Sequence, residues 1–113
     1  MNEYDLVCDN LMALVYVTTS NEEEAIKIGK LVVEKRLAAC SNIVSNMKSI
    51  YWWEGNLEED NEAILLLKTI EKNVDEIIDF IKGIHSYDNP CILAIPISNV
   101  SKNYLKWVKD EIN

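Results

Sequence analysis

Residues 47–69 read MKSIYWWEGNLEEDNEAILLLKT and predict a long β-hairpin. Glu54-Gly55-Asn56 is the turn signal, because Gly55 can adopt a positive φ angle. The run from Met47 to Trp53 precedes this turn, and Ile64 to Thr69 resumes a buried strand after an acidic stretch. We therefore expect long hairpin arms that project from the rest of the sheet.

A strand and a helix are predicted before this hairpin. Leu11 to Thr18 is an almost continuous apolar run, typical of a strand covered on both faces. Ser20 with Glu23 fits a capping box, the arrangement that starts many helices. Asn21 with Glu24 fits it equally well, so the helix start has two possible registers. The apolar stripe that follows must lie on a sheet, and its members are Ala25, Ile28, Val32 and Val33.

The segment between this helix and the hairpin turns apolar again. Leu37 to Ile43 predicts a second strand, which runs into a third strand from Met47 to Trp53. The Ser45-Asn46 pair between them indicates a turn or a β-bulge.

The last third of the chain predicts a helix, a strand and a short closing helix. Val74 to Ile84 is amphipathic, with Gly83 as a C-terminal cap or a break in the last turn. Cys91 to Ile97 is the final main strand, and Pro96 belongs near its end or on an edge because it lacks an amide donor. Ser101 can cap the closing helix.

The order β-α-β-β-α-β predicts a fold of the α/β (α+β) class. It is the ferredoxin-like split arrangement, a sandwich of helices on one face of an antiparallel sheet, here with an extended hairpin and a short C-terminal helix. We expect one domain over residues 1–113, with 1–10 as an N-terminal extension. Trp52 and Trp53 must face opposite sides of their strand, so at least one should meet another subunit. We expect the free edges of the sheet to be covered by other subunits in an oligomer.

Charge and cysteine usage exclude several classes of protein. The net charge of −8 argues against nucleic acid and anionic membranes as partners. Residues 1–10 carry no basic residue ahead of an apolar stretch, which predicts no secretory signal and a cytoplasmic protein. Cys8, Cys40 and Cys91 are odd in number and lack a C-x-x-C spacing, so we expect free thiols.

Chemistry or recognition is most expected at two polar-aromatic clusters, residues 49–55 and 85–90. The second contains His85, the only histidine, and a hydrophobic core has no need of its His-Ser-Tyr-Asp-Asn-Pro run. His85 has an alternative interpretation as a helix C-terminal residue that interacts with the last carbonyl groups. An enzyme would use His85 as a general base oriented by Asp88, with Tyr87 or Lys68 as the acid or electrostatic partner. We expect no enzyme, because the chain has no nucleophile elbow and no glycine-rich phosphate loop.

Two cysteines are candidate metal ligands. Cys40, in an apolar Leu-Ala-Ala-Cys context, fits a small buried hydrophobe better than a ligand. Cys91 could face either the core or a pocket, and its thiolate near His85 would make a soft pair suited to Cu(I). Two ligands make a poor site, so further donors would have to come from symmetry at an interface between subunits.

The chain resembles the CutA family, small proteins described as involved in divalent-cation tolerance. The resemblance runs from Leu14 to about Val108. It is carried by four segments: residues 33–43 (VEKRLAACSNI), 49–55 (SIYWWEG), 67–69 (LKT) and 85–90 (HSYDNP). The residues Glu58-Glu59 and the closing Tyr-Leu-Lys-Trp of residues 104–107 also fit.

This resemblance implies a ferredoxin-like protomer in a tight homotrimer, with copper or another divalent cation as ligand and a role in heavy-metal tolerance. It also implies a cleft between subunits that could orient a small polar ligand, lined by Trp53, Glu59, Lys68, His85, Tyr87 and Asp88.

Departures from the family pattern remove donors from a copper site. The family usually has His-Pro-Tyr-Glu where this chain has His85-Ser86-Tyr87-Asp88, and Glu often stands in the place of Cys91. Some members have a cysteine in the place of Val17 and a second histidine in that of Ile84. The alternative is a ligand-sensing or scaffold trimer like the PII signalling proteins, without a specific metal site. The missing phosphate loop weakens nucleotide sensing.

Overall fold

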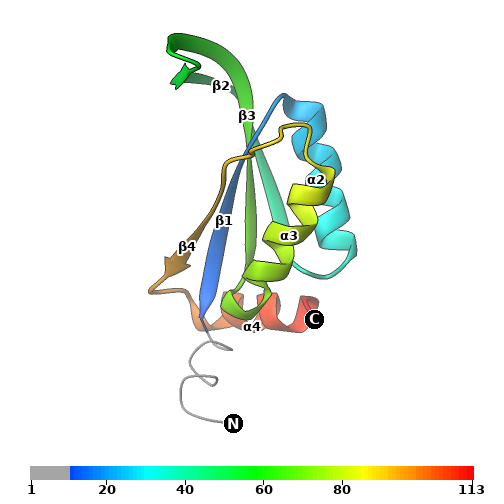
Figure 1. Cartoon of the computed structure of the whole chain (residues 1–113). Helices are drawn as coiled ribbons and strands as arrows, with labels where there is room; N and C mark the ends of the chain where they lie inside the picture. The colour runs from blue at the N-terminus through cyan, green and yellow to red at the C-terminus, as the bar shows by residue number, and fades with distance from the viewer. Residues whose placement is uncertain (1–10) are drawn as a thin grey trace.

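Four antiparallel strands form one sheet in the computed structural model, which describes residues 11–113 (Figure 1). The predicted extension 1–10 and Cys8 lie outside the described residues. The strands lie side by side in the order β2-β3-β1-β4. Their bounds are β1 Met12–Thr19, β2 Cys40–Trp53, β3 Asn56–Ile70 and β4 Ile92–Ile97. The helices are α2 Glu22–Glu34, α3 Val74–Ile84 and α4 Lys102–Glu111, with a short 3-10 turn, η1, at Glu71–Asn73.

Helices α2 and α3 cover one face of the sheet, which confirms the predicted ferredoxin-like fold (Figure 1). The core between them is made of alternate residues of β1 and β3 against the apolar stripes of the two helices. Its fully buried members include Val15, Val17, Ile28, Leu65, Leu67, Ile77 and Ile81. No helix within residues 11–113 is long and apolar enough to cross a membrane.

Helix α4 packs against the other face of the sheet, but only at one end. Its buried Val108 contacts a small cluster around Met12 and Ile70. The guanidinium group of Arg36 forms an ion pair of 3.0 Å with Glu111, tying the end of α4 to the residues after α2. Beyond α4, no element among residues 11–113 covers this face, and we call it the open face. Its apolar residues are Leu14, Tyr16, Val44, Ile64, Leu66, Leu93 and Ile95.

Helix α2 begins and ends with identifiable hydrogen bonds. Of the two capping registers, the structure has Asn21, whose side chain accepts from the backbone N–H of Glu24 at 2.8 Å. The helix ends at Glu34 with Lys35 as its C-cap, and the next residue, Arg36, has a φ of 62° in the left-handed region. The N–H groups of Arg36 and Leu37 then reach back to the carbonyls of Val33 and Val32, the pattern of a Schellman motif.

Two predictions about element boundaries are wrong. The second and third strands predicted over residues 37–53 are one strand, β2, because both parts pair with β3. The break between them is the β-bulge between Val44 and Met47, where Asn46 has a φ of 62°. Gly83 does not cap α3, since the helix continues to Ile84 and His85 is its C-cap. The predicted edge position of Pro96 and the Ser101 cap are confirmed.

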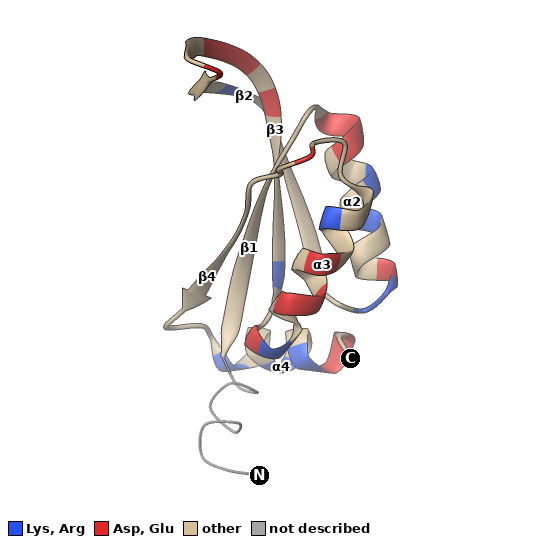
Figure 2. Ribbon diagram, in the orientation of Figure 1, with Lys and Arg blue, Asp and Glu red and all other residues tan. Residues whose placement is uncertain are grey.

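The hairpin projects from the body of the sheet as a two-stranded ribbon, as predicted. We call residues 47–62 the arm. Glu54 and Gly55 both have positive φ at its turn, 49° and 83°, which suits a tight two-residue connection. Acidic residues run along the arm (Figure 2). The exposed apolar side chains of the arm are Ile50, Tyr51, Trp52, Trp53 and Leu57.

Candidate functional site

His85 lies at the start of the loop between α3 and β4, residues 85–91, which we call the α3–β4 loop. Its side chain has no solvent-exposed area. Ring atom Nε2 is 2.8 Å from the carbonyl oxygen of Thr18, at the end of β1. Ring atom Nδ1 accepts from the backbone N–H of Tyr87 at 3.0 Å. Both ring nitrogens therefore have partners within the protein.

These two partners suit one tautomer of the imidazole. A backbone N–H can only donate and a carbonyl can only accept, so the hydrogen bonds fit the neutral tautomer with its proton on Nε2. A metal ion needs a free nitrogen lone pair, and the one on Nδ1 is used by Tyr87. In this arrangement His85 fastens the loop to β1, and it could bind a metal only after one of the two bonds had broken.

Glu24 is the second anchor of the α3–β4 loop. Its carboxylate accepts from the backbone N–H and the hydroxyl of Ser20, both at 2.9 Å, and from the backbone N–H of Ser86 at 2.8 Å. Burial alone would raise the pKa of Glu24, but the hydrogen bonds from Ser20 and Ser86 outweigh it and lower the pKa to about 2. The ionised carboxylate therefore joins the first turn of α2 to the loop.

Tyr87 carries the third connection of the loop, which reaches β3. Its hydroxyl donates to the carboxylate of Glu62 at 2.7 Å, and Glu62 is only 9% exposed. Burial and the hydrogen bond to Glu62 raise the pKa of Tyr87 far above its usual range, so the hydroxyl keeps its proton. The rings of His85 and Tyr87 also contact each other, with centroids 5.0 Å apart.

The two predicted metal ligands meet at one residue of β1. The N–H of Thr18 donates to the carbonyl of Cys91 at 3.1 Å, while the carbonyl of Thr18 faces Nε2 of His85. Cys91 is exposed. Within residues 11–113, however, no three His, Cys, Asp or Glu side chains lie close enough together to hold a metal ion. A single subunit therefore does not supply a complete site in the part of the chain that is described.

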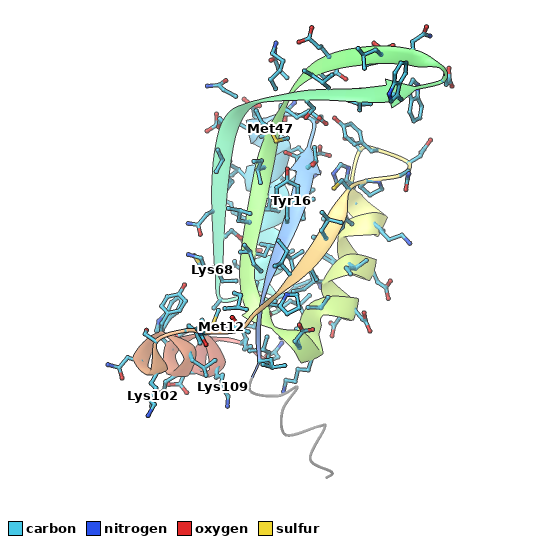
Figure 3. All side chains as sticks on the ribbon, turned by 90° about the vertical axis from the view of Figure 1, so that its left-hand side faces the viewer. Met12, Tyr16, Met47, Lys68, Lys102 and Lys109 are labelled. Atoms are coloured by element: carbon cyan, nitrogen blue, oxygen red, sulfur yellow. The ribbon has the colours of Figure 1, made fainter. Side chains whose placement is uncertain are left out.

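Only half of the six predicted cleft residues come together within one subunit. His85, Tyr87 and the exposed Asp88 share the α3–β4 loop. Lys68 pairs with Leu14, four positions along β1 from Thr18, which is about 13 Å of strand. Figure 3 shows Lys68 toward the α4 end of the sheet, and its Nζ lies 5.7 Å from the ring centroid of Tyr104.

Trp53 and Glu59 lie on the arm, away from the loop. Trp53 adjoins the turn at the tip of the arm, and Glu59 pairs with Ile50. A cleft with all six residues would need a second subunit, as the prediction of a cleft between subunits requires. The prediction that Cys40 is a buried core residue is wrong, because its side chain is only half-buried and it belongs to neither core cluster.

Sequence reasoning missed Thr18, Glu24 and Glu62 as members of this site. A signal existed for Glu24, because it is the acidic member of a capping box. Nothing in the sequence indicated that its carboxylate reaches Ser86, sixty-two positions away. Glu62 had no distinguishing signal among the many acidic residues of the arm.

Comparison with known proteins places this geometry in a family. The family model described as "CutA1 divalent ion tolerance protein" matches residues 13–111. The chain is 42% identical over 98 residues to the divalent-cation tolerance protein CutA of Archaeoglobus fulgidus, covering 87% of this chain and 95% of that protein. It is 39% identical over 97 residues to the chloroplastic protein CutA 1 of Oryza sativa, covering 86% of this chain. The chain spans about half the length of that plant relative and of human protein CutA.

Solved structures agree with the sequence relatives. The crystal structure of CutA1 from Oryza sativa superimposes with a TM-score of 0.89 at 37% identity, covering 91% of this chain and 94% of that one. The structure of the periplasmic divalent cation tolerance protein CutA from Archaeoglobus fulgidus gives a TM-score of 0.87 at 40% identity, covering 90% and 99%. The similarity therefore extends over nearly all of the described fold.

Proposed function

The chain belongs to the CutA1 divalent ion tolerance family, and we propose that it acts in metal tolerance as a homotrimer that binds copper or another divalent cation between its subunits. The observation that carries the proposal is the open face, an apolar sheet surface that no other part of residues 11–113 covers beyond α4. We further propose a binding role without catalysis, and a cytoplasmic location in keeping with unpaired cysteines.

Three surfaces of the subunit support an oligomer. On the open face, Leu93 is 53% and Ile95 47% exposed, although both lie on a strand paired with the central strand β1. Strands β2 and β4 are the outer strands of the sheet, and each has one edge without a neighbour among residues 11–113. Trp52, 73% exposed on the arm, adds a large aromatic surface. Permanent subunit interfaces usually bury exposed apolar area of this kind.

The placement of Cys91 supports an ion shared between subunits. Its thiol is exposed, and its backbone is fixed to Thr18 beside His85. Because one subunit lacks a third donor in the described residues, Cys91 groups from symmetry-related subunits would have to combine. Sulfur donors favour Cu(I) over hard divalent ions such as Mg²⁺.

Light scattering tests the oligomer. We expect a particle of three times the 13.0 kDa chain mass, and expect Leu93→Asp to reduce it because the charge would be buried at the interface. Glu23→Gln, an exposed change on α2 away from the open face, is the control. A wild-type monomer at micromolar concentration would contradict the trimer.

Calorimetric titration of the reduced protein with Cu(I), Cu(II) and Zn(II) tests the metal. We expect saturable binding with a fixed stoichiometry per trimer, lost in Cys91→Ser and retained in Cys40→Ser. His85→Ala reports whether the imidazole is a ligand, since unchanged affinity would assign it only the structural role of holding the loop. Weak uptake without fixed stoichiometry would contradict a specific site and assign cation binding to the acidic surface.

The second candidate is a trimer that senses a small polar ligand or serves as a scaffold without a specific metal site. The observation that favours it is His85, which is buried and has both ring nitrogens bonded to the protein. The same two experiments test this candidate. It requires a trimer in light scattering and no stoichiometric metal binding in the titration.

A further inference from the structure

The arm leaves the body of the sheet at a single level of β3. Strand β1 pairs with β3 only as far as Thr19 opposite Ala63, so from Glu62 outward β3 has only β2 beside it. The bulge of β2, between Val44 and Met47, falls at the same level. A two-stranded ribbon bends and twists more easily than the inside of a sheet. The arm turns away from the sheet at this level, which we call the hinge (Figure 3).

Two tyrosine hydroxyl groups from other elements hold the hinge. Tyr16 of β1 reaches the sulfur of Met47 at 3.5 Å, a weak contact because a thioether is a poor acceptor (Figure 3). Tyr87 of the α3–β4 loop donates to the carboxylate of Glu62 at 2.7 Å, in a site where Glu62 is almost fully buried. Hydrogen bonds to an ionised group are about twice as strong as neutral ones. The bond from Tyr87 is therefore the main side-chain restraint on the arm at this level.

Tyr87 is also bound to His85, through its backbone N–H group. The backbone N–H of Tyr87 donates to Nδ1 of His85, whose Nε2 faces the carbonyl of Thr18. Next to it, the backbone N–H of Ser86 is held by Glu24. Tyr87 thus has its backbone fixed to the body of the subunit and its hydroxyl fixed to Glu62, the arm residue next to the body of the sheet.

From this connection we propose that the hydrogen bond between Tyr87 and Glu62 couples the arm to the α3–β4 loop, so that release at either end loosens the other. A ligand that displaces the Tyr87 hydroxyl, or that draws His85 away from the Tyr87 backbone, frees the arm at its hinge. The effect of such a ligand on subunit contacts rests on the trimer proposed above. The coupling itself is a property of one subunit and does not depend on a metal ion or on the trimer.

Backbone ¹⁵N relaxation tests the coupling from the loop to the arm. Tyr87→Phe removes only the hydroxyl, and we expect the order parameters of arm amides 50–57 to fall from about 0.85 to below about 0.6. Tyr104→Phe on α4 is the matched control, because it changes the same group far from the hinge. Tyr104 also contacts Trp107, so the control should affect the indole signal of Trp107 and leave those of Trp52 and Trp53 unchanged.

The imidazole signals of His85 test the reverse direction. His85 is the only histidine, so its ring ¹⁵N resonances are assigned without ambiguity. Glu62→Ala, which removes the acceptor of the Tyr87 hydroxyl, should shift them toward a mixture of tautomers, whereas Glu59→Ala, an exposed change on the arm, should not. Unchanged arm order parameters in Tyr87→Phe would overturn the proposal. So would a His85 spectrum in Glu62→Ala that matches the wild type, and this second variant decides the matter if Tyr87→Phe does not fold.

Discussion

Glu24→Gln should destabilise the protein in a pH-dependent way, because the carboxylate of Glu24 is the buried acceptor that joins α2 to the α3–β4 loop. The side chain is 12% exposed and accepts from Ser20 and Ser86. Its pKa falls from 4.5 to about 2 on folding. At 1.36 kcal/mol per pH unit, this corresponds to about 3 kcal/mol of folding free energy at neutral pH. We expect the variant to lose about 2 to 3 kcal/mol at pH 7, since the amide oxygen keeps part of the bonding.

The sign of the pH dependence follows from the direction of the shift. The folded pKa of Glu24 lies below the unfolded value, so the folded state binds fewer protons. The contribution of Glu24 is therefore complete above about pH 4.5 and is lost as the pH falls toward about 2. The difference in unfolding free energy between wild type and Glu24→Gln should shrink over this range, even though many other carboxyl groups titrate in both proteins.

Urea denaturation at pH 7, 4.5, 3 and 2, at one fixed protein concentration, measures this difference. Glu23→Gln is the matched control, because Glu23 lies in the same first turn of α2 and is exposed. The reasoning is refuted if Glu24→Gln costs no more than Glu23→Gln at pH 7. A loss in Glu24→Gln that stays constant down to pH 2 would also refute it, since the cost would then be steric.

Three further substitutions test the packing and the caps by thermal denaturation. Gly29→Ala should destabilise by about 1–3 kcal/mol, because a Cβ there would lie 3.0 Å from the Leu65 side chain and 3.0 Å from the Ser41 hydroxyl. Gly83→Ala should stabilise by about 0.5–1 kcal/mol, because a Cβ in this helix meets nothing within 4 Å; a loss of stability would contradict the helical assignment. Ser101→Ala should cost about 1 kcal/mol, and an unchanged midpoint would mean that the 3.4 Å bond to the Tyr104 amide contributes nothing.

Most of the fold could be predicted from the sequence, because each element carries its own local signal. An almost continuous apolar run indicated β1, the apolar run from Ile64 to Thr69 indicated the inner part of β3, and helical stripes indicated α2 and α3. The predicted bounds of β1 and α3 agree with the structure to within one residue. The errors fall where two interpretations share one local pattern. Ser45-Asn46 suits a turn or a bulge, and only the pairing of both flanks with β3 selects the bulge. Gly83 suits a cap or a helix interior, and only the continued hydrogen bonding selects the interior.

The candidate site was predictable in part. His85 and Tyr87 were found because a histidine and a tyrosine beside a proline stand out from a core pattern. The roles of these two residues could not be predicted, because the partners of the loop, Thr18, Glu24 and Glu62, lie far away in the sequence. The same residue types would suit a metal ligand or a structural anchor, and the choice depends on what faces the two ring nitrogens.

The sequence by itself determined the elements of this protein, their order and the long hairpin, because periodicity, capping residues and turn residues act over a few positions. The resemblance to the CutA family could also be recognised from the sequence alone. Only the tertiary structure decided that His85 is buried between Thr18 and Tyr87, that Glu24 is ionised against Ser86, and that Glu62 stands at the hinge. Burial and hydrogen-bond partners arise when distant segments meet, and a local pattern does not contain that information.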